Sequence, residues 1–338
     1  MNKSFLKYAA GILMPAVVVF GSCRMKSDYR FEEGIAWNTL YHITYDSPSD
    51  LADSISRIFL EIDTSLSPFN PESTVSKIND NRTDTIDNMF RDVYLKSSLI
   101  SRESGGLFDP TLGPLIRAWG FGKGHEVNSD TLKIDSLLNL VGISKTAIQG
   151  NRIVKENSSI EFNFSALAKG YGVDCIADML ERNGVNNYLV EVGGEIRASG
   201  VNPKGNKWSI GIDRPLENGQ PGDAVTTLYV NEAAVATSGN YRNFHDRDGK
   251  RFGHTISPET GRPVQTDVIS ATVVAPSCME ADALATCCMV MGSEKALPFC
   301  TGMRVGVMLI LEDMSVVSNA AFNAFTGQSG EPGKEDRD

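Results

Sequence analysis

An aspartate and a threonine four residues apart, Asp282 and Thr286, are the side chains of this chain best placed to do chemistry together. The alanines around them favour a helix, and on a helix this spacing puts both oxygens on one face. The small neighbours leave that face open, and hard oxygen ligands favour Mg²⁺ or Ca²⁺. The same spacing suits a first-turn aspartate that complements the helix dipole, with Thr286 bonded to a carbonyl of its own helix. Spacing alone leaves both interpretations open.

A second candidate is the expected strand-to-helix junction over 163–174. Such a junction presents free backbone N–H groups and the positive end of the helix dipole to anions. Lys169 adds a positive charge within reach of a phosphate, and Ala166 and Ala168 keep the approach clear. An ordinary turn with Ser165 as the helix N-cap is the alternative.

His254 stands at an expected strand end before the turn over 257–263, and it is one of only four histidines. This makes it a candidate general base, with a structural hydrogen-bonding role as the alternative. The glycine-containing segments 191–195 and 237–242 permit close backbone approach or form simple turns. The loop over 106–124 offers aromatic faces and the carboxylate of Asp109, which suit a planar heterocycle or core packing.

Familiar nucleotide motifs are missing from the sequence. His125 occupies the place that a third glycine would need after Gly120 and Gly122, and no GxxxxGK[ST] run occurs. The net charge of −10 and the lack of a basic stripe argue against nucleic acid as a partner. The five cysteines that follow Cys23 show no CxxC spacing, so they predict neither a zinc site nor a disulfide framework.

The N-terminus has the pattern of a bacterial lipoprotein signal. Two lysines precede an apolar run and small residues directly before Cys23, which predicts a signal peptide over 1–22, acylation of Cys23 and an exported protein anchored on the periplasmic side of a membrane. A plain secretory signal is the alternative. We expect a tether over 23–33, one folded domain over 34–326 and a disordered tail over 327–338.

Hydrophobic periodicity predicts an α+β fold rather than a regularly alternating α/β fold. The expected helices cover 51–66, 93–104, 136–141, 166–183 and the Asp282 segment. The expected strands cover 40–45, 153–154 paired with 160–164, 188–192, 195–199, 208–212, 226–230, 268–274 and 305–311.

Taken in order, these blocks resemble the ApbE family of FAD:protein FMN transferases. The resemblance runs from about residue 34 to residue 311. It is carried by 65–70, 108–122, 165–171, 191–195, 237–239, 254–263 and 281–286.

The resemblance implies a T-fold-related, ApbE-like core of mixed or antiparallel sheets packed by helices. It also implies a Mg²⁺-dependent transfer of FMN from FAD to a threonine or serine of an acceptor protein, with release of AMP. The implied acceptor is a subunit of a membrane redox pump with a short Ser/Thr-Gly-containing motif. The implied catalytic residues are His254, which assists deprotonation of the acceptor hydroxyl, and Asp282.

The resemblance further implies which residues hold the metal and the flavin dinucleotide. The implied metal ligands are Ala166, Asp282, Ala285 and Thr286. The implied flavin-dinucleotide contacts are Trp37, Phe108, Asp109, Asn163, Lys169 and Ile256.

Two positions depart from the family pattern: Trp37-Asn38 replaces a usual Met-Gly, and Asn163 replaces a frequent Asp. Two other functions remain open. One is an exported Mg²⁺-dependent FAD pyrophosphatase that uses water as the nucleophile. The other is a non-catalytic flavin-binding lipoprotein.

Overall fold

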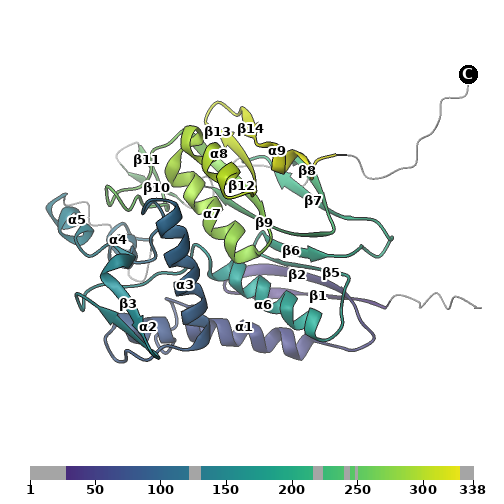
Figure 1. Ribbon diagram of the computed structural model, residues 1–338, viewed down its shortest axis with the longest axis horizontal. Coiled ribbons are helices and arrows are strands. Elements are labelled where there is room, and N and C mark those ends of the chain that lie inside the picture. The colour runs from purple at the N-terminus through teal and green to yellow at the C-terminus, as the bar shows by residue number, and fades with distance from the viewer. Residues whose placement is uncertain (1–27, 122–130, 216–223, 240–243, 248–249, 328–338) are drawn as a thin grey trace, which may run out of the picture.

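The computed structural model describes residues 28–121, 131–215, 224–239, 244–247 and 250–327 (Figure 1). The predicted signal peptide, the lipidation site Cys23 and the tail beyond residue 327 lie outside them.

Eight strands of the described residues form one sheet in which every neighbouring pair is antiparallel. In spatial order they are β1 (Tyr29–Ala36), β2 (Thr39–Asp46), β5 (Tyr188–Val192), β6 (Glu195–Ser199), β9 (Glu232–Gly239), β12 (Val268–Ala275), β13 (Gly306–Leu311) and β14 (Val316–Ser318). Three separate two-stranded ladders are β3 (Thr146–Gln149) with β4 (Arg152–Lys155), β7 (Trp208–Asp213) with β8 (Ala224–Val230), and β10 (Phe244–Arg247) with β11 (Lys250–Gly253).

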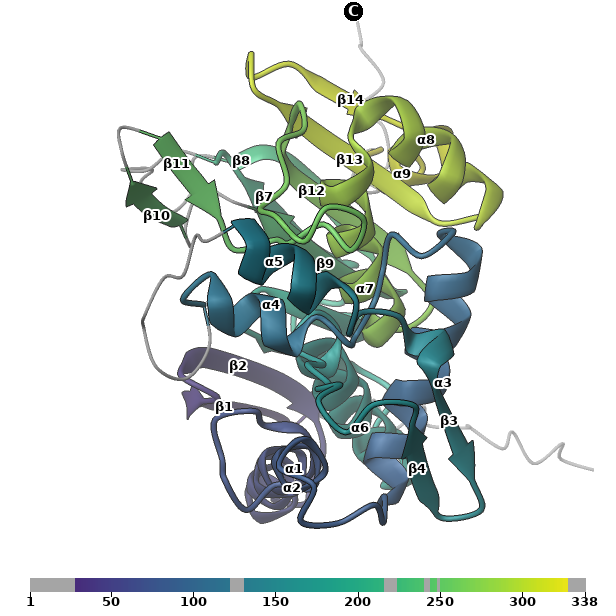
Figure 2. The same cartoon turned by 90° about the vertical axis from the view of Figure 1, so that its left-hand side faces the viewer.

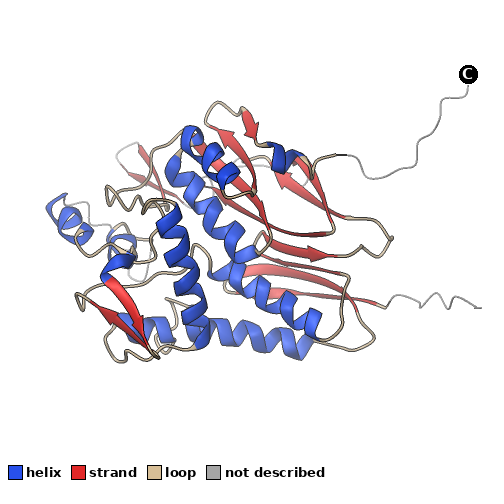
Figure 3. Ribbon diagram, viewed as in Figure 1, coloured by secondary structure: helices blue, strands red, loops and turns tan. Residues whose placement is uncertain are grey.

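Helices α1, α6 and α7 lie over one face of the large sheet, as Figures 1 and 3 show. The helices are α1 (Ala52–Leu66), α2 (Thr74–Asn79), α3 (Asn88–Glu103), α4 (Gly113–Ala118), α5 (Thr131–Leu138), α6 (Ala168–Arg182), α7 (Cys278–Met291), α8 (Ser293–Gly302) and α9 (Ala320–Asn323), with a 3₁₀ turn over Ile143–Lys145. Within the described part of the chain, no helix has the length and apolar character to cross a membrane.

The central strands of the large sheet are buried on both faces because their residues alternate between two apolar cores. On β9, Ala234 and Ala236 belong to the helix-side core, whereas Val235 belongs to the core shared with the β7–β8 hairpin. On β7 itself, alternate residues are buried and exposed. The result is helices, a large antiparallel sheet and a hairpin in successive layers, which confirms the predicted α+β class.

Five predicted segments differ from the structure. Residues 160–164 are not a strand paired with β4, because β4 pairs with β3; instead Phe162 and Phe164 are both buried against Phe90, and this packing mimics the alternation of a strand. Residues 29–33 belong to β1 rather than to a tether. Residues 237–239 extend β9 rather than forming a turn. The helix predicted over 93–104 begins at Asn88, as α3, and the helix predicted over 136–141 covers Thr131–Leu138, as α5.

Viewed from the side, α4 and α5 lie toward the viewer, in front of the layered body (Figure 2). They share a small core with Trp119 and Ile256. The Trp119 indole N–H donates to the Gly261 carbonyl at 2.8 Å, which ties the loop after α4 to the turn that follows His254.

Candidate active site

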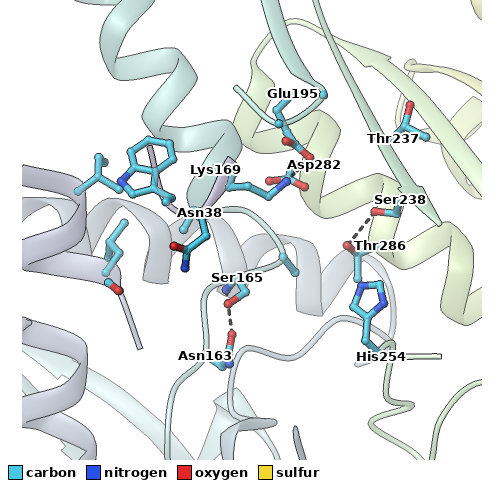
Figure 4. Close-up of a pocket in the computed structure, with 18 of the residues that line it drawn as sticks. Asn38, Asn163, Ser165, Lys169, Glu195, Thr237, Ser238, His254, Asp282 and Thr286 are labelled. Atoms are coloured by element: carbon cyan, nitrogen blue, oxygen red, sulfur yellow. Dashed lines mark hydrogen bonds and ion pairs between the residues drawn. The ribbon is translucent and has the colours of Figure 1, made fainter. Parts of the chain in front are cut away.

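A cavity of about 1290 Å³ brings the predicted site residues together (Figure 4). It is larger than the roughly 300–1,000 Å³ of an ordinary small-molecule pocket, so it has room for a dinucleotide. Ten of the predicted residues line it: Trp37, Phe108, Asp109, Asn163, Ala166, Lys169, His254, Ile256, Asp282 and Thr286. Ala285 is fully buried and is not one of its lining residues.

The start of α6 is joined to the Asp282 carboxylate by a backbone hydrogen bond. The Gly170 N–H lies in the first turn of α6, where backbone N–H groups have no partner within the helix, and it donates to Asp282 Oδ2 at 3.1 Å. Ala166, just before the helix, lines the cavity. The predicted N-cap, Ser165, is wrong: the cap position is Leu167, without a side-chain hydrogen bond, and the Ser165 N–H donates to Asn163 Oδ1 at 2.9 Å.

Asp282 lies more than one turn into α7, which begins at Cys278, so it does not sit in the first turn as a dipole partner; Glu280 does. Its side chain is buried. Burial raises the pKa of the Asp282 carboxyl to about 8, with Lys169 opposing the rise and Glu195 adding to it. A cation bound here would favour the ionised form of the Asp282 carboxyl.

The Thr286 hydroxyl faces a second hydroxyl across the helix–sheet boundary. Its Oγ1 lies 3.2 Å from Ser238 Oγ on β9, as the dashed line in Figure 4 shows. The alternative role, a bond to a carbonyl of its own helix, therefore does not describe this side chain. Ser238 lines the same cavity and was not among the predicted site residues, because the segment around it was read as a turn.

The position of α7 relative to α6 is fixed by backbone contacts. Asp174 on α6 accepts hydrogen bonds from the N–H groups of Cys278 and Met279, both at 2.9 Å, which satisfies two free donors at the start of α7. At Gly170, a Cβ atom would lie 2.3 Å from the Cys278 carbonyl oxygen. Only glycine permits this close approach, so the Asp282 face of α7 is held against the start of α6.

Lys169 brings a positive charge between two carboxylates. Its ammonium forms an ion pair with Glu195 of β6, and in Figure 4 its side chain reaches toward both Glu195 and Asp282. Burial disfavours the charged ammonium, but the carboxylates of Glu195 and Asp282 outweigh burial and raise the pKa of Lys169. Lys169 is therefore a fixed cation at the cavity wall.

Trp37 forms an aromatic wall of the cavity. Trp37 and Asn38 are the two residues of the β1–β2 turn, with φ values of 50° and 61°, which is the type I′ geometry that favours Asn and Gly. The indole N–H donates to the Phe59 carbonyl at 3.2 Å, and the two rings meet edge to face. The ring packs over Gly172, where a Cβ would lie 2.3 Å from it.

Both carboxylate oxygens of Asp109 accept hydrogen bonds from within the protein, one from its own loop and one from the 3₁₀ turn after α5. Oδ1 accepts from the Thr111 N–H at 2.8 Å and from the Thr111 hydroxyl, and Oδ2 accepts from the Ile143 N–H at 2.8 Å. Burial nevertheless raises the pKa of this carboxyl above its usual range. The observed contacts make Asp109 the organiser of the loop that carries Phe108 to the cavity.

His254 follows β11 and lines the cavity, half-buried. Its ring meets Phe121 edge to face at 6.4 Å between centroids. The next residues form the predicted turn, in which the Gly261 N–H donates to the Ser257 carbonyl at 2.8 Å. The Trp119 indole holds this turn in place through its hydrogen bond to the Gly261 carbonyl. The segment that carries the His254 imidazole is therefore fixed at the turn that follows it.

The donor set suits a hard cation. No group of three or more His, Cys, Asp or Glu side chains that could hold a metal occurs within the described ranges. Around Asp282 the cavity instead combines a buried carboxylate with the hydroxyls of Thr286 and Ser238, and Ala166 also lines it. Oxygen ligands of this kind, completed by water and substrate phosphates, are those that Mg²⁺ prefers.

Comparison with known proteins gives one consistent result. The family model described as "ApbE family" matches residues 37–310. A protein from Vibrio cholerae named FAD:protein FMN transferase is 32% identical over 89% of this chain and 93% of its own length. An Escherichia coli K12 protein of the same name is 33% identical over 88% of this chain and 89% of its own length.

Solved structures agree with the sequence relatives. The flavin transferase ApbE from Vibrio cholerae superposes with a TM-score of 0.79 at 32% identity, covering 88% of this chain and 99% of that one. An ApbE protein from Thermotoga maritima superposes with a TM-score of 0.81 at 27% identity, covering 89% and 100%. With its matched length, its layered fold and its cavity, this chain belongs to the ApbE family.

Proposed function

We propose that this protein transfers the FMN moiety of FAD to a threonine or serine hydroxyl of an acceptor protein and releases AMP. The observation that carries the proposal is the oxygen-donor group where α6 meets α7, set in a cavity large enough for a dinucleotide. The names of the relatives support the same activity. The acceptor we propose is a membrane redox-pump subunit with a Ser/Thr-Gly-containing motif.

In this reaction the acceptor oxygen forms a bond to the FMN phosphorus, and the bond from that phosphorus to the bridging oxygen of AMP breaks. Lys169 contributes its positive charge to the pyrophosphate. His254 takes the proton of the attacking hydroxyl. The Trp37 and Phe108 walls hold the dinucleotide in place, so that catalysis consists mainly of positioning and charge stabilisation.

Mg²⁺ is the metal we propose for the site, held by the Asp282 carboxylate, the Thr286 hydroxyl and the Ala166 carbonyl. When bound, it would neutralise the pyrophosphate and polarise the phosphorus that is attacked. Ala285 lies inside α7, where its carbonyl is part of the helix ladder, so its role as a ligand remains a prediction.

The acceptor reaction is tested by incubating the protein with FAD, Mg²⁺ and an unflavinylated redox-pump subunit that carries the motif. We expect mass spectrometry to find one FMN increment on one threonine or serine, with AMP in equal amount. FMN and AMP formed at the same rate with and without acceptor, and with no labelled residue, would identify a pyrophosphatase instead. Bound FAD with no AMP under any condition would identify a flavin-binding protein.

Asp282→Asn is expected to lower FMN transfer by at least about 100-fold at saturating FAD, because it removes the carboxylate of the metal site. EDTA should abolish transfer by the unchanged protein, and added Mg²⁺ should restore it. The matched control is Glu280→Gln on the same helix, which lies outside the cavity and pairs with Lys96 at 3.1 Å. Full Mg²⁺-dependent transfer by the Asp282 variant would refute the metal site.

His254→Ala is expected to slow transfer by about 100-fold while FAD binding stays intact, because the imidazole acts on the acceptor proton. Stopped-flow single turnover and equilibrium dialysis of FAD separate the two quantities. His42→Ala is the control, since His42 pairs with Glu191 and lies outside the cavity lining. Weakened FAD binding with normal single-turnover chemistry would argue against the base role.

We also propose that Cys23 carries a lipid that anchors the protein on the periplasmic side of a bacterial membrane. Cys23→Ser should move the protein from the membrane fraction to the soluble exported fraction, because the acyl chains supply the membrane affinity. Cell fractionation and incorporation of labelled palmitate measure this. Equal labelling and equal membrane association of the two proteins would contradict lipidation at Cys23.

A further inference from the structure

Glu195 is a buried carboxylate whose hydrogen-bonding capacity is only half used. Its side chain is on the helix-facing side of β6, 3% of the residue is exposed, and it lines the cavity. One oxygen pairs with the Lys169 ammonium, whereas Oε2 has no hydrogen-bond partner in the structure. An unpartnered buried carboxylate oxygen is costly, so its retention calls for an explanation other than stability.

A second group of ion pairs, on the same strand but outside the cavity lining, gives a comparison with a purely structural arrangement. Arg197, two residues along β6, pairs with Asp174, Asp178 and Glu181 of α6. There one guanidinium serves three carboxylates, and two of the three are about half exposed to water. Glu195 has the opposite arrangement: it is buried, faces the cavity and pairs with a lysine that also lies near Asp282.

We propose that Glu195 is a positioning residue that holds the Lys169 ammonium in the orientation in which it meets the pyrophosphate. This inference rests on the proposed transfer reaction. A lysine side chain is a flexible stem carrying a point charge, so its position must be fixed by a partner. The ammonium has three N–H groups. Glu195 anchors it from the β6 side, and the remaining N–H groups can point into the cavity.

The geometry also gives Glu195 a role in charge balance. Lys169, Glu195 and Asp282 come from α6, β6 and α7, and together they carry one positive and two negative charges when ionised. Glu195 offsets the lysine without occupying the Asp282 carboxylate. Asp282 therefore keeps an oxygen for a cation, and Lys169 keeps its charge for the phosphate.

The test is a double-mutant cycle on FMN transfer to the redox-pump subunit, at saturating Mg²⁺. Glu195→Gln keeps the shape but loses the anchor, so we expect kcat to fall about 100-fold while KM for FAD stays within about threefold. Lys169→Met should lower kcat at least as much. Because Glu195 acts through Lys169, adding Glu195→Gln to Lys169→Met should lower kcat no further and should raise Tm, since it removes an unpaired buried charge.

The control is Asp178→Asn, which removes a carboxylate from α6 away from the cavity and should leave kcat and KM unchanged. Wild-type kcat in Glu195→Gln, or a further large loss of kcat when it is added to Lys169→Met, would overturn the inference. If Glu195→Gln alone does not fold, comparing the double variant with Lys169→Met decides the question by the same kcat criterion. Failure of the unchanged protein to label the acceptor would refute the transfer reaction itself, which is a distinct outcome.

Discussion

The close crossing of α6 and α7 is the contact on which the rest of the site depends. Gly170 lets the two backbones approach, and Asp174 on the next turn of α6 caps the first N–H groups of α7. These contacts leave α7 little freedom to slide or rotate against α6. As a consequence the Gly170 N–H, a free donor in the first turn of α6, meets Asp282. One packing constraint therefore places a buried carboxylate of α7 against the start of α6.

The same crossing explains why several charges can be buried together. An isolated buried carboxylate would simply take up a proton, and burial does raise the pKa values of Asp282, Glu195 and Asp174. Lys169 and Arg197 supply the compensating charges from α6 and β6. The excess of acidic over basic groups around the cavity suits a site that binds a cation, because the cation offsets the negative charge of the buried carboxylates and of an anionic dinucleotide.

The sequence predicted those parts of the molecule that depend on short-range patterns. The spacing of Asp282 and Thr286 correctly put both on the cavity side of α7, and most long strands were predicted within a few residues. The sequence pattern could not identify Ser238 or Glu195 as site residues, because their significance comes from long-range contacts with Thr286 and Lys169. The strand predicted over 160–164 was wrong for a related reason. Two phenylalanines in alternate positions give the same sequence pattern in a strand and in an extended segment packed into the core.

The unusual backbone of the Trp37-Asn38 turn is accommodated by packing rather than by flexibility. A tryptophan with positive φ is strained, and such strain persists only when surrounding contacts impose it. Here the ring is fixed on three sides: by the Phe59 carbonyl, by the Phe59 ring and by the surface of Gly172. Because no larger residue fits beneath the indole, Trp37 and Gly172 constrain each other. The wall they form is rigid before any ligand enters. A flat ring that stacks there therefore binds with little entropic cost from further ordering of the protein.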